Sequence, residues 1–146
     1  MAMARREPLA DLIVLARDLP ELRLIVEIKR GGHFDRPAAI QQLASYMARS
    51  NCPLGLMVTP RQTWMLRDTY EGEDSIREVA VYDTAVLLGV AEIPDNENDL
   101  EMLVGSWLDG LTSGSAASVA KEVRPDVARY LLPAVAEGRV ESGRFG

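Results

Sequence analysis

The nine residues Leu22–Arg30, LRLIVEIKR, alternate between two sets of side chains with a period of two. That period predicts a β-strand, because successive side chains of a strand point to opposite faces. On one face Ile25 would be followed by Glu27 and then Lys29. A buried strand does not normally carry an acid and an amine on one face, because uncompensated buried charge is unfavourable. The pattern therefore predicts a strand whose far end carries functional groups.

The segments on either side of this strand predict a hairpin and a crossover. Residues 11–16, DLIVLA, read as a strand that returns antiparallel through the turn residues 17–21, RDLPE. Asp35 is a residue type typical of a helix N-cap and Pro37 is typical of a first helical turn, and Asn51-Cys52-Pro53 is expected to end the helix. Residues 54–59 form the next strand, and a strand–helix–strand connection favours parallel placement in one sheet.

The rest of the chain predicts a second hairpin and then helices. We expect a core over residues 1–93 and a helical C-terminal extension over residues 94–146, in the same domain or as an oligomerisation arm. The patterns indicate strands at Thr63–Thr69 and Ile76–Tyr82, an ambiguous apolar run at Ala85–Val90, a linker at Pro94–Asp99, a helix at Leu100–Leu111, and a helical region from Val119 to about Arg139 interrupted by Pro125 and Pro133.

Composition indicates an ordinary soluble globular protein of one domain. The chain has 146 residues, 47% of them apolar, and its single cysteine, Cys52, suits a reducing cytoplasm and is expected to be a small buried or turn residue. It contains no apolar run of membrane-spanning length and no secretion signal, so we expect a cytoplasmic protein without a membrane partner. Residues 1–67 carry ten Arg and Lys against six Asp and Glu, whereas residues 68–146 carry six against sixteen. Any contact with phosphate is therefore expected in the first half.

Two acids are expected to meet in the first hairpin. With a turn at residues 17–21, Asp11 comes out opposite Glu27 within about one residue of register. Two neighbouring carboxylates repel unless a cation lies between them, and Mg²⁺ takes one or two carboxylates and keeps several waters. The backbone carbonyl of Ile28 would complete the ligand set. Lys29 would orient or deprotonate a water for attack on phosphorus. Asp18 is the alternative acid, but it lies in the turn.

The identity of the amine adds information. The chain has 14 Arg and only two Lys. A Lys at the one position where a deprotonatable amine differs chemically from a guanidinium favours a catalytic role. The alternative is a solvated ion pair on an edge strand, which would contribute little.

The spacing D-(x15)-E-I-K, followed by a helix containing Gln42-Leu43-Ala44-Ser45-Tyr46, resembles the PD-(D/E)XK nuclease superfamily in its QxxxY branch. That branch includes RecB-type nucleases and the N-terminal nuclease domains of type I restriction motor subunits. The resemblance covers residues 8–60. It implies a restriction-endonuclease-like mixed sheet with a crossover helix, metal ligation by Asp11 and Glu27, catalysis by Lys29, and DNA contact or site support by Gln42 and Tyr46.

The chain departs from the family pattern at two places. Ala10 stands where the family name has proline. The family core also begins with a helix, often carrying another acid, and a strand before the Asp-bearing strand. Only ten residues precede Asp11, and Glu7 is the one acid among them. We expect this N-terminally abbreviated sheet to lack an element, to have it replaced by the C-terminal helices, or to gain it from a second chain.

The sequence therefore predicts a Mg²⁺-dependent nuclease, with Mn²⁺ as a substitute metal, that hydrolyses DNA phosphodiester bonds. DNA and either a second copy or a partner protein are the expected partners. The alternative is a catalytically silent nuclease-like module for nucleic-acid binding or assembly, and a third hypothesis is a structural subunit.

Overall fold

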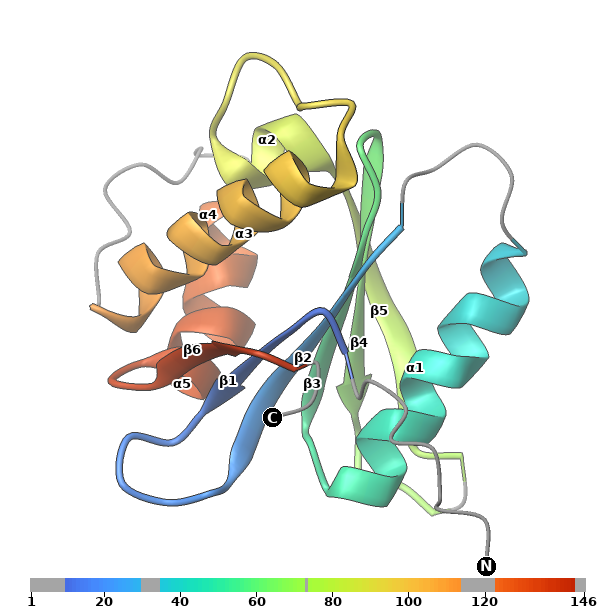
Figure 1. The fold of residues 1–146 in the computed structure, drawn as a ribbon. Helices are drawn as coiled ribbons and strands as arrows, with labels where there is room; N and C mark the ends of the chain where they lie inside the picture. Colours follow the sequence, from blue (N-terminus) through green and yellow to red (C-terminus); the bar gives the residue numbers. More distant parts are fainter. Residues whose placement is uncertain (1–9, 30–34, 73, 114–122, 144–146) are drawn as a thin grey trace, which may run out of the picture.

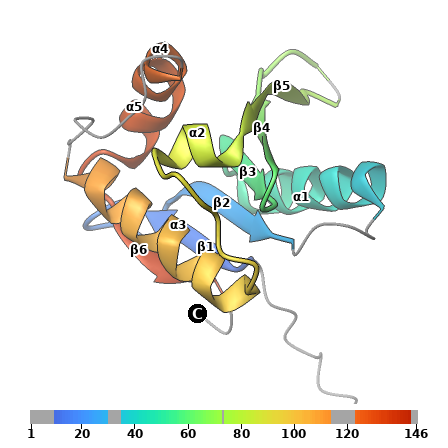
Figure 2. The same cartoon turned by 90° about the horizontal axis from the view of Figure 1, so that it is seen from above.

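A six-stranded mixed sheet forms the centre of the molecule, with helices on both of its faces (Figure 1, Figure 2). The computed structural model describes residues 10–29, 35–72, 74–113 and 123–143. The strands lie in the order β5-β4-β3-β2-β1-β6. The elements are β1 (Leu12–Leu15), β2 (Leu22–Ile28), α1 (Arg36–Ser50), β3 (Leu54–Val58), β4 (Gln62–Asp68), β5 (Ile76–Asp83), α2 (Thr84–Leu88), α3 (Glu97–Thr112), α4 (Arg124–Asp126), a π-helix (Val127–Leu131), α5 (Leu132–Val135) and β6 (Arg139–Ser142). The predicted α/β class with a mixed sheet is confirmed.

The first hairpin forms as predicted. Strands β1 and β2 pair antiparallel, with Leu12 opposite Val26. The backbone N–H of Ala16 donates to the carbonyl of Glu21 at 2.8 Å and closes the connection. Both strands are shorter than the sequence pattern suggested, and β2 ends at Ile28.

The crossover helix and the parallel strand are also confirmed. Asp35 caps α1, and its side chain accepts a hydrogen bond from the backbone N–H of Ala38 at 3.1 Å. Pro37 lies in the first turn, where its missing N–H is tolerated. Asn51 ends the helix in the left-handed conformation, with φ at 55°. Strand β3 then pairs parallel with β2, so α1 returns the chain across one face of the sheet.

The two faces of the sheet bury separate hydrophobic clusters. One cluster joins the sheet to α1, and we call this side the α1 face. The other joins the sheet to α2, α3, the π-helix and α5. The buried sheet residues of the α1 face are Ile13, Ile25, Met57, Trp64 and Leu66, and those of the opposite face include Leu12, Val14, Leu24, Val26, Ile28, Leu54, Leu56, Val58 and Met65.

The polar stretch that the sequence indicated as a linker is partly helical. Residues 94–99 were expected to be irregular, but α3 begins at Glu97. The side chain of Asn96 accepts hydrogen bonds from the N–H groups of Asn98 and Asp99 at 2.8 and 3.2 Å, which satisfies two donors of the first turn. The ambiguous run at 85–90 is the short helix α2. Within the described ranges no helix is long and apolar enough to cross a membrane.

The C-terminal part is not wholly helical, which corrects the sequence-based expectation. A five-residue π-helix separates α4 from α5, and Pro133 lies in the first turn of α5. Residues 139–142 then form β6, which pairs antiparallel with β1 and places Ser142 opposite Leu12. The place beside β1 is therefore taken by a C-terminal strand of this chain, and not by a helix.

Candidate active site

Glu27 and Lys29 lie on the α1 face of the sheet, because Ile25 belongs to the cluster on that face and successive side chains of a strand alternate between faces. Asp11 directly precedes β1 and lies beside the same end of β2, where its side chain accepts a hydrogen bond from the backbone N–H of Ile28. All three charged residues are half-buried.

The first hairpin brings Asp11 close to Glu27. Leu12 pairs with Val26 in the ladder, and the backbone N–H of Asp11 also donates to the carbonyl of Val26 at 3.1 Å. Asp11 and Leu12 therefore share Val26 as their partner, as two successive residues do at a β-bulge. This places Asp11 within about one residue of the position opposite Glu27, which is compatible with the predicted proximity of the two acids.

The carboxylate of Asp11 also has a structural role that the sequence did not indicate. Its Oδ2 accepts a hydrogen bond from the backbone N–H of Ile28 at 2.7 Å. Strand β1 begins only at Leu12, so the side chain replaces a backbone acceptor at the end of the ladder. The N–H and the C=O of one residue in a strand point to the same neighbouring strand. The carbonyl of Ile28 is therefore directed to the side of the strand where Asp11 lies.

Lys29 lies one pleat beyond Glu27. Its backbone N–H donates to the carbonyl of Val58 at 2.8 Å, so the chain is still held against β3 at this point. Two residues of a strand span roughly 6 to 7 Å, a distance that the flexible side chain of Lys29 covers. In the part of the chain that the structure describes, the side-chain amine of Lys29 makes no hydrogen bond or ion pair.

Gln42 and Tyr46 meet each other on α1. The Gln42 side-chain amide donates to the Tyr46 hydroxyl at 3.3 Å. Tyr46 is buried in the cluster of the α1 face, and Gln42 is exposed. Among the described contacts, no hydrogen bond joins either residue to Asp11, Glu27 or Lys29. DNA contact or support of the site by these two residues therefore stays a prediction.

The described residues contain no group of three or more His, Cys, Asp or Glu side chains arranged around one metal position. In the predicted ligand set Asp11 and Glu27 would supply two carboxylates, and the carbonyl of Ile28 would supply a third oxygen. Such a donor set suits Mg²⁺, which is bound through one or two carboxylates while several waters remain. Glu7, the upstream acid candidate, lies outside the described residues.

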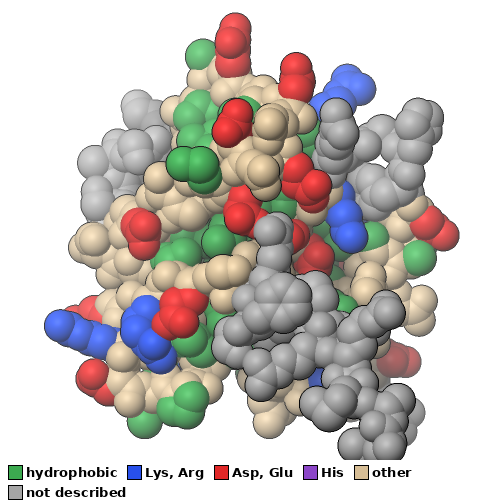
Figure 3. Space-filling view, in the orientation of Figure 1, with side chains coloured by type: hydrophobic (Ala, Val, Ile, Leu, Met, Phe, Trp, Pro, Cys, Tyr) green, Lys and Arg blue, Asp and Glu red, His purple; other side chains and the backbone are tan. Residues whose placement is uncertain are grey.

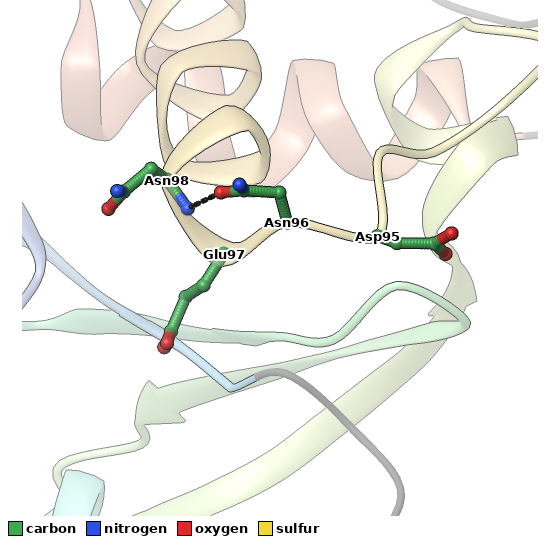
Figure 4. Close-up of a pocket in the computed structure, with 4 residues that line it drawn as sticks. All are labelled: Asp95, Asn96, Glu97 and Asn98. Atoms are coloured by element: carbon green, nitrogen blue, oxygen red, sulfur yellow. Dashed lines mark hydrogen bonds between the residues drawn. The ribbon is translucent and has the colours of Figure 1, made fainter.

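A second concave site lies at the start of α3 and was not predicted. A cavity of about 360 Å³ is lined by Asp95, Asn96, Glu97 and Asn98 (Figure 4). The Asn96 side chain is turned onto the backbone of the helix, whereas the carboxylates of Asp95 and Glu97 point away from each other (Figure 4). These acids complement the positive end of the helix dipole and would repel a phosphate. The cavity is therefore a capped helix start rather than a nucleic-acid contact.

Acidic and basic side chains are mixed on the face seen in Figure 3, where red and blue atoms lie close together between α3 and the upper end of β2. Such a surface gives little nonspecific attraction for a polyanion. Binding of a phosphate to this face would therefore require individual Arg or Lys side chains at specific positions.

A scan against protein-family models, a search of curated proteins and a search of solved structures each found no match to this chain. The residues themselves therefore carry the functional interpretation.

Proposed function

We propose that this chain is a Mg²⁺-dependent nuclease of the PD-(D/E)XK kind, which hydrolyses DNA phosphodiester bonds. The observation that supports the proposal is the proximity of Asp11, Glu27 and Lys29 at the carboxyl end of β2. The backbone N–H of Asp11 donates to the carbonyl of Val26, and its carboxylate accepts the N–H of Ile28, so Asp11 is held against this end of β2. The pleat places the amine of Lys29 on the same face as Glu27.

The two acids fit a divalent cation because of their ligand chemistry. Carboxylate oxygens are the protein ligands of Mg²⁺, which takes one or two of them and keeps several waters. Asp11 and Glu27 would hold the ion together with the carbonyl of Ile28. When bound there, Mg²⁺ supplies positive charge that acidifies a coordinated water and offsets charge on the phosphate.

Lys29 acts on the water rather than on the ion. Its amine is compact and can lose its proton, which a guanidinium does not do at any physiological pH. From its place one pleat beyond Glu27 it holds the attacking water in line with the phosphorus and accepts or shares its proton. Because α1 covers the same face, the position of Gln42 and Tyr46 limits how far DNA can enter.

The proposed fold is a restriction-endonuclease-like core formed by the β1–β2 hairpin, α1 and β3. In this proposal β6 substitutes for the strand that would precede the Asp-bearing strand, because it pairs with β1 along its length. The order of hairpin, crossover helix and parallel strand supports the assignment.

A catalytically silent module for nucleic-acid binding or assembly is the second candidate. One observation favours it. Oδ2 of Asp11 already accepts the N–H of Ile28 at 2.7 Å, so part of this carboxylate serves the sheet. In a silent module that bond alone would account for an acid at position 11.

Cleavage assays separate the two candidates. Closed circular and linear duplex DNA are incubated with the purified chain in Mg²⁺ and, separately, in EDTA. We expect Mg²⁺-dependent cleavage that Glu27→Ala and Lys29→Ala each abolish. The matched controls are Glu21→Ala and Arg23→Ala, because these two residues form an exposed ion pair at the opposite end of β2. Cleavage that survives in both Glu27→Ala and Lys29→Ala would exclude the mechanism.

A further inference from the structure

Three threonines meet where β3 turns into β4. Thr59, Thr63 and Thr84 are the buried polar side chains of the described residues, with exposures of 4%, 0% and 0%. The Oγ1 atoms of Thr63 and Thr84 lie 2.8 Å apart, and Thr84 Oγ1 donates to the carbonyl of Thr59 at 2.7 Å. Buried hydroxyls must be hydrogen-bonded, and a fully satisfied network makes its surroundings rigid.

This network fixes the two-residue turn formed by Pro60 and Arg61. Thr59 Oγ1 donates to the carbonyl of Gln62 at 2.8 Å and accepts from its N–H at 3.0 Å. The carbonyl of Arg61 itself accepts the backbone N–H of Thr84 at 3.1 Å. Hydrogen bonds from two elements thus hold the backbone on both sides of Arg61.

The turn lies at the same end of the sheet as the candidate active site. The carbonyl of Val58, just before Thr59, accepts the backbone N–H of Lys29 at 2.8 Å. In Figure 1 the β3–β4 turn and the end of β2 point to the same side of the molecule. Lys29 and the turn therefore lie at the same end of the sheet, so one extended ligand that crosses this end would pass both.

Arg61 is exposed, and its guanidinium is uncommitted within the described part of the chain. Arg36, by contrast, pairs with Glu78 and stacks on Trp64, whereas none of the described ion pairs or ring contacts uses Arg61. A cavity of about 680 Å³ beside it lies on the α2 side of the sheet end and is lined by Pro60, Arg61, Gln62, Asp83, Ala85 and Ile93. The carboxylate of Asp83 accepts the N–H of Val86 as the cap of α2.

We infer that Arg61, with Gln62 beside it, contacts the DNA backbone at a phosphate next to the one that is cleaved. Thr59, Thr63 and Thr84 are positioning residues for this contact. The inference rests on the proposed function, because it uses DNA as the ligand. A guanidinium matches a phosphate with two parallel hydrogen bonds. A turn that is already rigid avoids the entropy loss of ordering a loop on binding.

The test is the salt dependence of binding to a short DNA duplex. Ca²⁺ replaces Mg²⁺, and the DNA is checked to remain intact, so that binding is measured without turnover. Each phosphate contact contributes about 0.9 to the slope of log affinity against log salt concentration. Arg61→Ala should lower the magnitude of this slope by about 0.9. The ratio of wild-type to variant DNA affinity should therefore fall about three- to fourfold between 50 and 200 mM salt. Arg61→Lys should keep the slope.

The positioning role has its own readout. Thr84→Val removes the hydroxyl while keeping the shape, and should weaken DNA binding, whereas Thr84→Ser should bind as wild type does. Because Thr84 acts through Arg61, the double variant Arg61→Ala/Thr84→Val should bind within about twofold of Arg61→Ala alone. If the double variant instead lost DNA affinity by the product of the two single-variant losses, the positioning role of Thr84 would be overturned. Arg61→Ala lies on the surface and tests the contact even where Thr84→Val fails to fold.

The outcomes for this contact and for the nuclease proposal are distinguishable. An unchanged slope in Arg61→Ala, an equal loss in the control Arg23→Ala, or no DNA binding by wild type would each overturn the inference. Cleavage by wild type in Mg²⁺ decides the nuclease proposal separately. A normal Arg61 effect without cleavage would leave the contact in place and exclude hydrolysis.

Discussion

The carboxylate of Asp11 has two tasks in this account, and a pair of substitutions separates them. It accepts the N–H of Ile28 at 2.7 Å, and it is proposed to bind the metal with Glu27. Asp11→Ala removes both tasks. Asp11→Asn keeps an oxygen that can accept the N–H but removes the negative charge.

The stability change follows from the hydrogen bond. A bond to a charged acceptor contributes about 1.5 to 3 kcal/mol, and this one is partly buried beside Ile28, which is 1% exposed. Asp11→Ala should therefore lower the free energy of unfolding by about 2 kcal/mol. Asp11→Asn keeps an oxygen that accepts the N–H, but the bond becomes a weaker, uncharged one. We expect its free energy of unfolding, without metal, to lie within about 1 kcal/mol of wild type.

Urea denaturation, followed by the fluorescence of Trp64 and Trp107, measures the stability, and Mg²⁺-dependent DNA cleavage measures the activity. Both variants should lose cleavage, although only Asp11→Ala loses substantial stability. Full cleavage by Asp11→Asn would refute metal binding by this carboxylate. An unchanged midpoint for Asp11→Ala would refute the structural role of the bond to Ile28.

Three further predictions test separate parts of the structure. Lys29→Arg should abolish cleavage but keep DNA binding, because a guanidinium keeps the positive charge and does not release a proton. Cleavage assays and binding titrations on the same variant check this prediction, and near-normal cleavage would contradict it. Gly138→Ala should lower the free energy of unfolding by about 1 to 3 kcal/mol, because the added Cβ would lie 2.9 Å from the carbonyl oxygens of Leu15 and Val135; urea denaturation should show it, and an unchanged midpoint would contradict the placement of β6. Burial raises the pKa of the Cys52 thiol from 9.0 to about 11, and a backbone hydrogen bond with Leu54 partly offsets this rise. The folded state therefore holds this proton where the unfolded state has lost it, so stability should fall by about 2 to 3 kcal/mol as pH rises from 9 to 11; Cys52→Ala should lack this component in urea denaturation across pH, and identical slopes would contradict it.

The first half of the fold was predictable because its signals are local. The period of two marks β2, the cap Asp35 and Pro37 mark the start of α1, and the βαβ connection implies a parallel β3. The prediction that Asp11 comes close to Glu27 uses the same local information, since the turn length sets the register of a hairpin; the bond from the N–H of Asp11 to the carbonyl of Val26 shifts that register by one residue. Cys52, expected to be a buried or turn residue, is 1% exposed.

The remaining features depend on contacts between distant segments. Strand β6, with the sequence RVES, has a single apolar residue, and only its pairing with β1 makes it a strand. The start of α3 was hidden by polar residues that suit both a linker and a capped helix. The threonine network could not be predicted, because each hydroxyl finds its partner only when β3, β4 and α2 are assembled.

The bond between Asp11 and Ile28 was missed for a related reason. The pattern indicates a strand from residue 11, so it suggests a backbone partner for Ile28. The observed strand begins at Leu12, which leaves the side chain of Asp11 to accept the N–H. An acidic residue directly before a strand that is shorter than its partner is the signal that would have indicated this second role, because its side chain can accept an N–H of the longer strand.

The central claim is that Asp11 and Glu27 share one divalent cation, and anomalous scattering from crystals soaked in Mn²⁺ tests it most directly. We expect one peak roughly 2 Å from a carboxylate oxygen of each acid, as hard cations with oxygen ligands require, and no such peak in crystals of Glu27→Ala. Ordered Asp11 and Glu27 side chains without a peak between them at saturating Mn²⁺ would contradict the claim.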